Sequence, residues 1–202
     1  MIDSSVYFLK KKLKGSNEKT AEHLDRIKSK VKSSTEVIEG LLNLTQMKQP
    51  RLEKFNLKAL VPEVLSAFDT PAGIKATQSF PEGDVSIYAD HRLLGLAFKN
   101  ILKNSIEAMG GEGSISVKIR VAPADSVEIS FSDTGPGIDI EDIDKIFQPF
   151  FSTKAGGIGF GLSITRMVID RHKGTIEARS EKGKGVIFII RLPYYFNKDK
   201  EK

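Results

Sequence analysis

Hydrophobic residues in the first part of the chain follow a seven-residue repeat that is typical of packed helices. They are spaced four, three and four positions apart from Ile2 to Leu13, then alternately three and four apart from Leu24 to Thr45, with two polar interruptions. A narrow apolar stripe on so charged a helix is not buried by that helix alone. The short polar break at residues 15–20 favours an antiparallel helical hairpin, and the stripe predicts that two such hairpins form a four-helix bundle in a dimer.

Beyond Pro50, which ends the long helical pattern, the sequence predicts a series of short strands and helices. Helical spacing covers residues 57–68, 91–109 and 162–173. Alternating residues predict strands at 73–80 and 84–90 around a Pro-Glu-Gly turn, further strands at 113–122 and 126–133, and a closing hairpin at 175–193. This order indicates an α+β sandwich, in which helices cover one face of a mainly antiparallel sheet. We therefore expect two domains, residues 1–50 and 51–202.

Composition narrows the range of functions. The 202 residues include 31 basic and 26 acidic ones, and the resulting net charge of +5 suits an anionic ligand such as a nucleotide but is too small and dispersed for nucleic-acid binding. The absence of cysteine excludes disulfides and thiolate metal sites. No apolar run approaches the ~20 residues that span a membrane, and no signal peptide is evident. We expect a cytoplasmic chain without membrane contacts, although a longer parent protein can be membrane-anchored.

Two asparagines lie on one face of the strongest predicted helix. Asn100 and Asn104 are one turn apart in an otherwise apolar stretch. Their side chains either cap a neighbouring loop or present amide oxygens to a cation and phosphates, and this stretch alone leaves both readings open. Oxygen ligands suit Mg²⁺, which is commonly shared with substrate phosphates.

A second candidate site follows the strand at 126–133. Asp133 ends this strand, and Gly135 and Gly137 follow in the sequence "DTGPGI". Glycines let the backbone adopt positive φ and approach a ligand closely. A carboxylate at this point can accept a hydrogen bond from an exocyclic amine such as that of adenine. The alternative is an ordinary turn at the end of a strand.

A third candidate site is rich in glycine and precedes a predicted helix. Gly156, Gly157, Gly159 and Gly161 supply backbone N–H groups which, with the positive end of the helix, form an anion site. No Lys-Ser or Lys-Thr pair follows them, which excludes the common phosphate loop, and the strand of a dinucleotide-binding motif is missing. Lys154, just upstream, would add a positive charge facing a triphosphate.

Taken together, these stretches resemble a known family. "NILKNSIEAM", "DTGPGI", "IFQPFFSTK" and "GGIGFGLSI" are similar, in order and spacing, to the N, G1, F and G2 boxes of the sensor histidine kinase ATP-binding domain, and "GTIEARSEKGKGVIFIIRLP" resembles its closing hairpin. The resemblance covers about residues 53–193. It implies a Bergerat-type α/β sandwich that binds ATP and Mg²⁺.

The resemblance also implies roles for individual residues. Asn104 would be the Mg²⁺ ligand with Asn100 beside it, and Asp133 would bind the adenine amine in a pocket shaped by Gly135 and Gly137. Phe147 and Phe150 would anchor a mobile lid over ATP, and Lys145 stands where the family often has a basic residue. The remaining nucleotide-binding residues implied by the F and G2 boxes are Lys154, Gly157, Gly159, Gly161 and Leu162.

The N-terminal helices resemble the family's dimerisation and phosphoacceptor hairpin, which implies a homodimer and a response regulator as partner. In that family a histidine followed by Glu or Asp, with a proline soon after, receives the phosphoryl group. His23, His91 and His172 are not followed by an acidic residue. We therefore expect no certain catalytic residue in this chain, an acceptor position ahead of Met1 in a shortened first helix, and no self-labelling. His23 is expected to be a surface residue.

Two alternatives to a kinase portion remain. One is a non-catalytic nucleotide-binding dimerisation module, which the four intact boxes disfavour. The other is a gyrase-like ATPase of the same superfamily, which would carry a glutamate as general base one turn before the Mg²⁺-binding asparagine. Here Asn100 holds that position and cannot take up a proton. Glu107, three residues beyond Asn104, could replace it, but we expect an exposed glutamate at the helix end.

Overall fold

The computed structural model describes residues 2–12, 20, 22–28, 30–31, 34–35, 38, 49–68, 70–123, 125–154 and 157–194. In the N-terminal part, α1 covers Ile2–Lys12 and the described residues between 20 and 38 are helical. The connecting residues 13–19 and stripe positions such as Leu41 and Thr45 lie outside the described residues. The hairpin, the domain boundary at residue 50 and the dimer therefore stay predictions.

The described residues of the N-terminal hydrophobic repeat are only partly buried. Leu24 is buried, whereas Ile27 and Ile38 are 47% and 58% exposed. His23 is exposed, as expected for a surface residue. No helix in the described part of the chain has the length and apolar character needed to cross a membrane.

A five-stranded mixed sheet forms the core of the remaining chain. Its order is β2-β4-β5-β7-β6, with β2 parallel to β4 and every other neighbouring pair antiparallel. The strands are β2 (Gly73–Ser79), β4 (Glu112–Ala122), β5 (Ser126–Asp133), β6 (Thr175–Ser180) and β7 (Val186–Pro193). The prediction of a mainly antiparallel sheet is confirmed.

The Pro-Glu-Gly stretch does not close a hairpin. The strand that follows it, β3 (Ser86–Ala89), pairs instead with β1 (Glu53–Asn56) in a separate two-stranded sheet. The sequence did not indicate β1, because "EKFN" is short and contains a single apolar residue. Its pairing with β3 brings Phe55 opposite Ile87, a contact between segments far apart in the chain.

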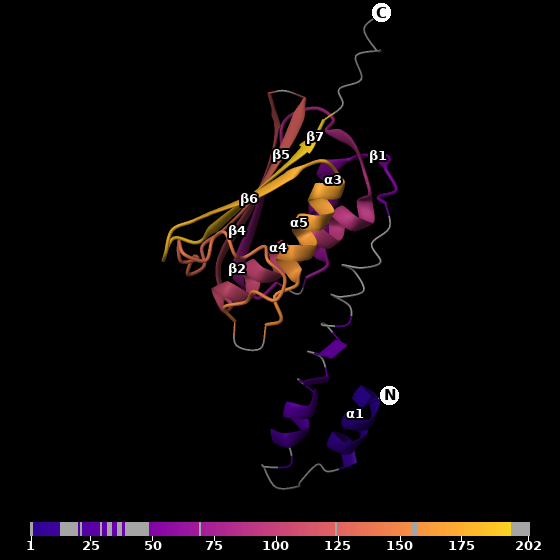
Figure 1. Ribbon diagram of the computed structural model, residues 1–202, viewed down its shortest axis with the longest axis vertical. Helices are drawn as coiled ribbons and strands as arrows, with labels where there is room; N and C mark the ends of the chain where they lie inside the picture. Colours follow the sequence, from indigo (N-terminus) through magenta and orange to yellow (C-terminus); the bar gives the residue numbers. More distant parts are fainter. Residues whose placement is uncertain are drawn as a thin grey trace, which may run out of the picture.

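Three helices cover one face of the large sheet (Figure 1). They are α3 (Leu57–Ser66), α4 (His91–Met109) and α5 (Gly161–Arg171). The longest of them, α4, lies against the middle of the sheet, where the rings of Phe98 and Phe131 meet edge to face with centroids 5.0 Å apart. Gly110 at its end has a left-handed φ of 65°, the conformation that commonly stops a helix.

Asp90 joins the start of α4 to the end of α5. Its Oδ1 accepts a 3.0 Å hydrogen bond from the Leu93 N–H, and its Oδ2 accepts one of 3.0 Å from the Arg51 N–H. Burial tends to raise the pKa of Asp90, but these backbone hydrogen bonds outweigh it and lower the pKa. The Asp90 N–H donates to His172 Nε2 at 2.9 Å, and His172 Nδ1 lies 2.7 Å from the Val168 carbonyl. These contacts fit a buried imidazole whose Nε2 accepts and whose Nδ1–H donates to the Val168 carbonyl.

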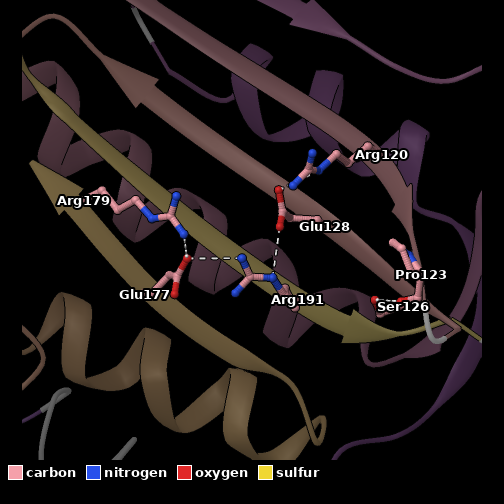
Figure 2. Close-up of polar contacts among 7 residues, drawn as sticks. All are labelled: Arg120, Pro123, Ser126, Glu128, Glu177, Arg179 and Arg191. Carbon is pink, nitrogen blue, oxygen red and sulfur yellow. Dashed lines mark hydrogen bonds and ion pairs between the residues drawn. The ribbon is translucent and has the colours of Figure 1, made fainter.

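The open face of the sheet carries a ladder of charged side chains (Figure 2). Glu128 on β5 accepts hydrogen bonds from Arg120 Nε at 2.8 Å and Arg191 Nε at 3.0 Å, and Glu177 on β6 binds Arg191 and Arg179. Burial tends to raise the pKa of Glu128, and the two arginines lower it by a larger amount. Because strand side chains alternate, these charges lie on the face of the sheet opposite the helices.

Candidate functional site

A cavity of about 750 Å³ lies between α4, the start of α5 and the long loop that follows β5. It collects side chains from stretches that are far apart in the sequence. The predicted site residues that line it are Asn100, Asn104, Asp133, Gly137, Lys154, Gly157, Gly159, Gly161 and Leu162. The three candidate sites of the sequence therefore form one site.

Asp133 lines this cavity and is only 7% exposed. Its Oδ1 accepts hydrogen bonds from the N–H groups of Gly135 at 3.0 Å and Val186 at 3.2 Å. Its Oδ2 accepts a hydrogen bond of 2.7 Å from the Ser105 hydroxyl. Since a carboxylate oxygen has two lone pairs, Oδ2 keeps the capacity to accept from a ligand amine.

The walls around Asp133 require glycine. Gly137 has φ +76°, and a β-carbon there would overlap the carbonyl oxygen of Glu181. Gly185 has φ +87°, and a β-carbon there would overlap the carbonyl oxygen of Asp133. Gly185 lies within the predicted closing hairpin at 175–193, and sequence reasoning did not connect it with Asp133, because their contact exists only after β5 and β7 pair.

The two asparagines have different surroundings. Asn100 Nδ2 donates to the Gly161 carbonyl at 3.0 Å, which ties α4 to the first turn of α5. Asn104 lies one turn further along α4, where its Oδ1 faces the Lys154 ammonium at 3.4 Å. The loop-holding reading therefore fits Asn100, and the amide oxygen of Asn104 is the one directed toward a positive charge.

The glycine-rich loop leads directly into α5. Gly159 has φ +78°, and a β-carbon there would overlap the backbone of Phe151. The N-cap residue of α5, Phe160, makes no capping hydrogen bond with its side chain. The backbone N–H groups around Gly161 and Leu162 are therefore suited to an anionic ligand. Gly157 also lines the cavity, whereas Gly156 lies outside the described residues.

The predicted lid residues do not line the cavity. Phe147 is buried, with its ring 6.4 Å from that of Phe188 and the Arg166 guanidinium 4.3 Å above it. Phe150 is 65% exposed, and its ring centroid lies 4.8 Å from that of Phe160. Lys145 is also outside the lining and pairs with Asp142 at 3.1 Å.

Apolar side chains that sequence reasoning missed complete the cavity. Among them are Leu96, Ile138, Ile146, Phe151 and Phe188. Their apolar character marks them as core residues in the sequence, and nothing local distinguishes a residue that lines a cavity from one that fills it.

This arrangement fits a purine nucleoside triphosphate with a divalent cation. The apolar wall and the fixed carboxylate of Asp133 suit an adenine ring and its amine. The uncapped start of α5 and the Lys154 ammonium suit phosphates, and the Asn104 oxygen suits Mg²⁺ held jointly with them. Gly135 contributes through its hydrogen bond to Asp133 and not by lining the cavity.

Comparisons with known proteins point in the same direction. Residues 89–195 match the family described as histidine kinase-, DNA gyrase B-, and HSP90-like ATPase. The chain is 35% identical over 176 residues to the signal transduction histidine-protein kinase AtoS of Escherichia coli K12, covering 85% of this chain and 29% of AtoS. It is 31% identical to sporulation kinase E of Bacillus subtilis, covering 94% of this chain and 26% of that kinase. The chain thus spans about a quarter to a third of these relatives.

Solved structures give the same fold. The catalytic domain of histidine kinase ThkA matches with a TM-score of 0.64 and 34% identity, over 71% of this chain and 95% of that domain. ThkA in complex with the response regulator protein TrrA matches with a TM-score of 0.75 and 27% identity, over 96% of this chain and 57% of ThkA.

Proposed function

The chain belongs to the histidine kinase-, DNA gyrase B-, and HSP90-like ATPases, and its relatives place it among the histidine kinases. From this premise we propose that it is the ATP-binding catalytic portion of a two-component sensor protein-histidine kinase. The observation that supports this most is the single cavity that joins the Asp133 carboxylate, the Asn104 amide and the start of α5.

Each side chain has a distinct task in the proposed reaction. Asp133 accepts a hydrogen bond from the adenine amine and so selects ATP. The N–H groups at the start of α5, together with Lys154, hold the phosphates, and Asn104 offers its oxygen to Mg²⁺. Bound Mg²⁺ would neutralise charge that develops on the β- and γ-phosphates. Phe147, fixed under Arg166, anchors one end of the loop that covers the nucleotide, and Phe150 lies within it.

The acceptor in this proposal is a histidine that this chain does not carry in the family's pattern. Its imidazole nitrogen attacks the γ-phosphorus, the bond to the β–γ bridging oxygen breaks, and ADP leaves. The phosphoryl group then passes to an aspartate of a response regulator. Asn100 stands where a hydrolytic relative would place its base, and Glu107 is engaged by Lys154 at 2.7 Å. Both features favour transfer to a protein over hydrolysis of ATP by water.

We further propose that residues 1–50 form the dimerisation hairpin and residues 51–202 the catalytic domain. The seven-residue repeat supports a homodimer, and the ThkA complex supports a response regulator as partner. A cytoplasmic location, with or without a membrane anchor in a longer parent protein, follows from the need for ATP.

Calorimetric titration with Mg-ATP and incubation with γ-labelled ATP test this function. We expect binding of Mg-ATP, no acid-labile label on the chain itself, and label on an added kinase that keeps its acceptor histidine but whose own ATP site has been inactivated. No binding of Mg-ATP would refute the proposal. Binding of Mg-ATP without any label on the added kinase would favour the non-catalytic nucleotide-binding module. Rapid steady-state release of phosphate would favour the gyrase-like ATPase.

A further inference from the structure

One ion pair joins two residues that line the cavity, Glu107 and Lys154. The Lys154 ammonium, on the loop before α5, lies 2.7 Å from Glu107 Oε2 on the last turns of α4. It also lies 3.4 Å from Asn104 Oδ1 and 3.5 Å from the Asn104 carbonyl. The side chains of Lys154 and Glu107 are 39% and 44% exposed.

These contacts place a positive charge beside the oxygen that would receive Mg²⁺. An ammonium at 3.4 Å from Asn104 Oδ1 and a dication on the same oxygen repel each other. Lys154 therefore has to move away from Asn104 when Mg²⁺ binds. The triphosphate, with its several negative oxygens, provides a stronger partner for the ammonium than a single exposed carboxylate.

The negative charge of Glu107 opposes the binding of a phosphate ligand unless a positive group pairs with it. It lines the same cavity as Asn104, and its carboxylate would repel a triphosphate. Within the described part of the chain, Glu107 also lies 3.9 Å from Lys103, a weaker contact than the one with Lys154. The ion pair with Lys154 thus offsets the negative charge of Glu107. It also holds Lys154 next to Asn104, where Mg²⁺ would bind.

We propose that Glu107 is a positioning residue that holds Lys154 in the nucleotide-free protein, and that Mg-ATP takes the Lys154 ammonium from Glu107. This inference rests on the proposed function, because it assumes that Mg-ATP enters this cavity. The exchange weakens ATP binding by the cost of breaking the pair, and it couples the loop before α5 to the presence of a triphosphate. Adenosine, which has no phosphates, leaves the pair intact.

A double-mutant cycle tests the exchange. We expect Glu107→Gln to bind Mg-ATP about three- to tenfold more tightly than the unaltered chain, and Lys154→Met to bind it more weakly. In the Lys154→Met background the gain from Glu107→Gln should shrink, because the pair no longer has to be broken. Adenosine affinity should be the same in all four proteins. Glu82→Gln, an exposed substitution in the segment between β2 and β3, is the control for the change in net charge.

The outcomes separate this inference from the proposed function. Equal gains from Glu107→Gln in both backgrounds would mean that the glutamate acts only as a bulk charge, and would refute the exchange. An unchanged Mg-ATP affinity of the Glu107→Gln protein would also refute the exchange. In both cases, the proposed function would stand as long as the unaltered chain binds Mg-ATP. Failure of the unaltered chain to bind Mg-ATP would refute both.

Discussion

Replacing Asp133 by asparagine tests the centre of the site with almost no change in shape. Oδ1 accepts two backbone N–H groups, from Gly135 and Val186, so the amide oxygen of Asn must take that position. Its NH₂ group then takes the place of Oδ2, where the Ser105 hydroxyl can rotate to accept. The atom that faces the ligand changes from an acceptor into a donor.

The structure sets the size of the effect. Losing a hydrogen bond to a charged group, with the ligand amine left unpaired, costs about 1.5–3 kcal/mol, which corresponds to roughly 10- to 150-fold in affinity. The two backbone hydrogen bonds to Oδ1 persist with a neutral acceptor. The free energy of unfolding should therefore fall by only about 1–2 kcal/mol.

Calorimetry with ATP and with inosine triphosphate measures the change directly. Inosine carries a carbonyl where adenine carries its amine, so the preference for ATP should fall at least tenfold in Asp133→Asn. Urea unfolding monitors stability, and Asp170→Asn at the exposed end of α5 is the matched control. If Asp133→Asn retains both the affinity for ATP and the preference over inosine triphosphate, the assignment of Asp133 is wrong.

Glu128→Gln should lower the free energy of unfolding by about 1–2 kcal/mol at neutral pH. The pKa of Glu128 is lowered in the folded protein, so its ionised carboxylate stabilises the fold above the unfolded pKa, and this stabilisation is lost as pH falls through the folded pKa. The free energy of unfolding of the variant, measured in urea, should therefore change less as the pH is lowered. Gly137→Ala should destabilise the fold more than Gly83→Ala in thermal unfolding, since both have φ near +75° but only Gly137 would collide with backbone; equal losses would refute the clash. In ¹⁵N spectra at pH 8, His172 should be the Nδ1–H tautomer, because Nε2 accepts from the Asp90 N–H; an Nε2–H ring would contradict this geometry.

Local sequence patterns predicted most of the helices and strands, because these elements depend largely on residues that are close together in the chain. The helix at 91–109 and the strand at 126–133 have the predicted bounds in the structure, since each combines a strong period with a clear end signal such as Gly110. The candidate residues were found for a similar reason. Polar residues and glycines in an apolar helix or after a strand are locally costly, and this cost marks them as candidates for a function.

Partners that lie far apart in the sequence could not be predicted. The strand β1 carries a weak local signal and exists through its pairing with β3. The pairing of Glu107 with Lys154 also spans a long stretch of chain, so the sequence alone suggested only an exposed glutamate. Ser105 looked like an ordinary helix residue until α4 packed against the end of β5 and placed its hydroxyl on Asp133.

The sequence by itself identified the candidate residues of a nucleotide site and the elements in which they lie. It did so because side-chain chemistry, helical spacing and the backbone freedom of glycine are local properties. Only the tertiary structure decided that Asn100 holds the start of α5, that Gly185 closes the wall beside Asp133, and that Phe147 lies in the core outside the cavity. These are properties of packing, since each depends on a distance between segments that meet only when the sheet and its helices assemble.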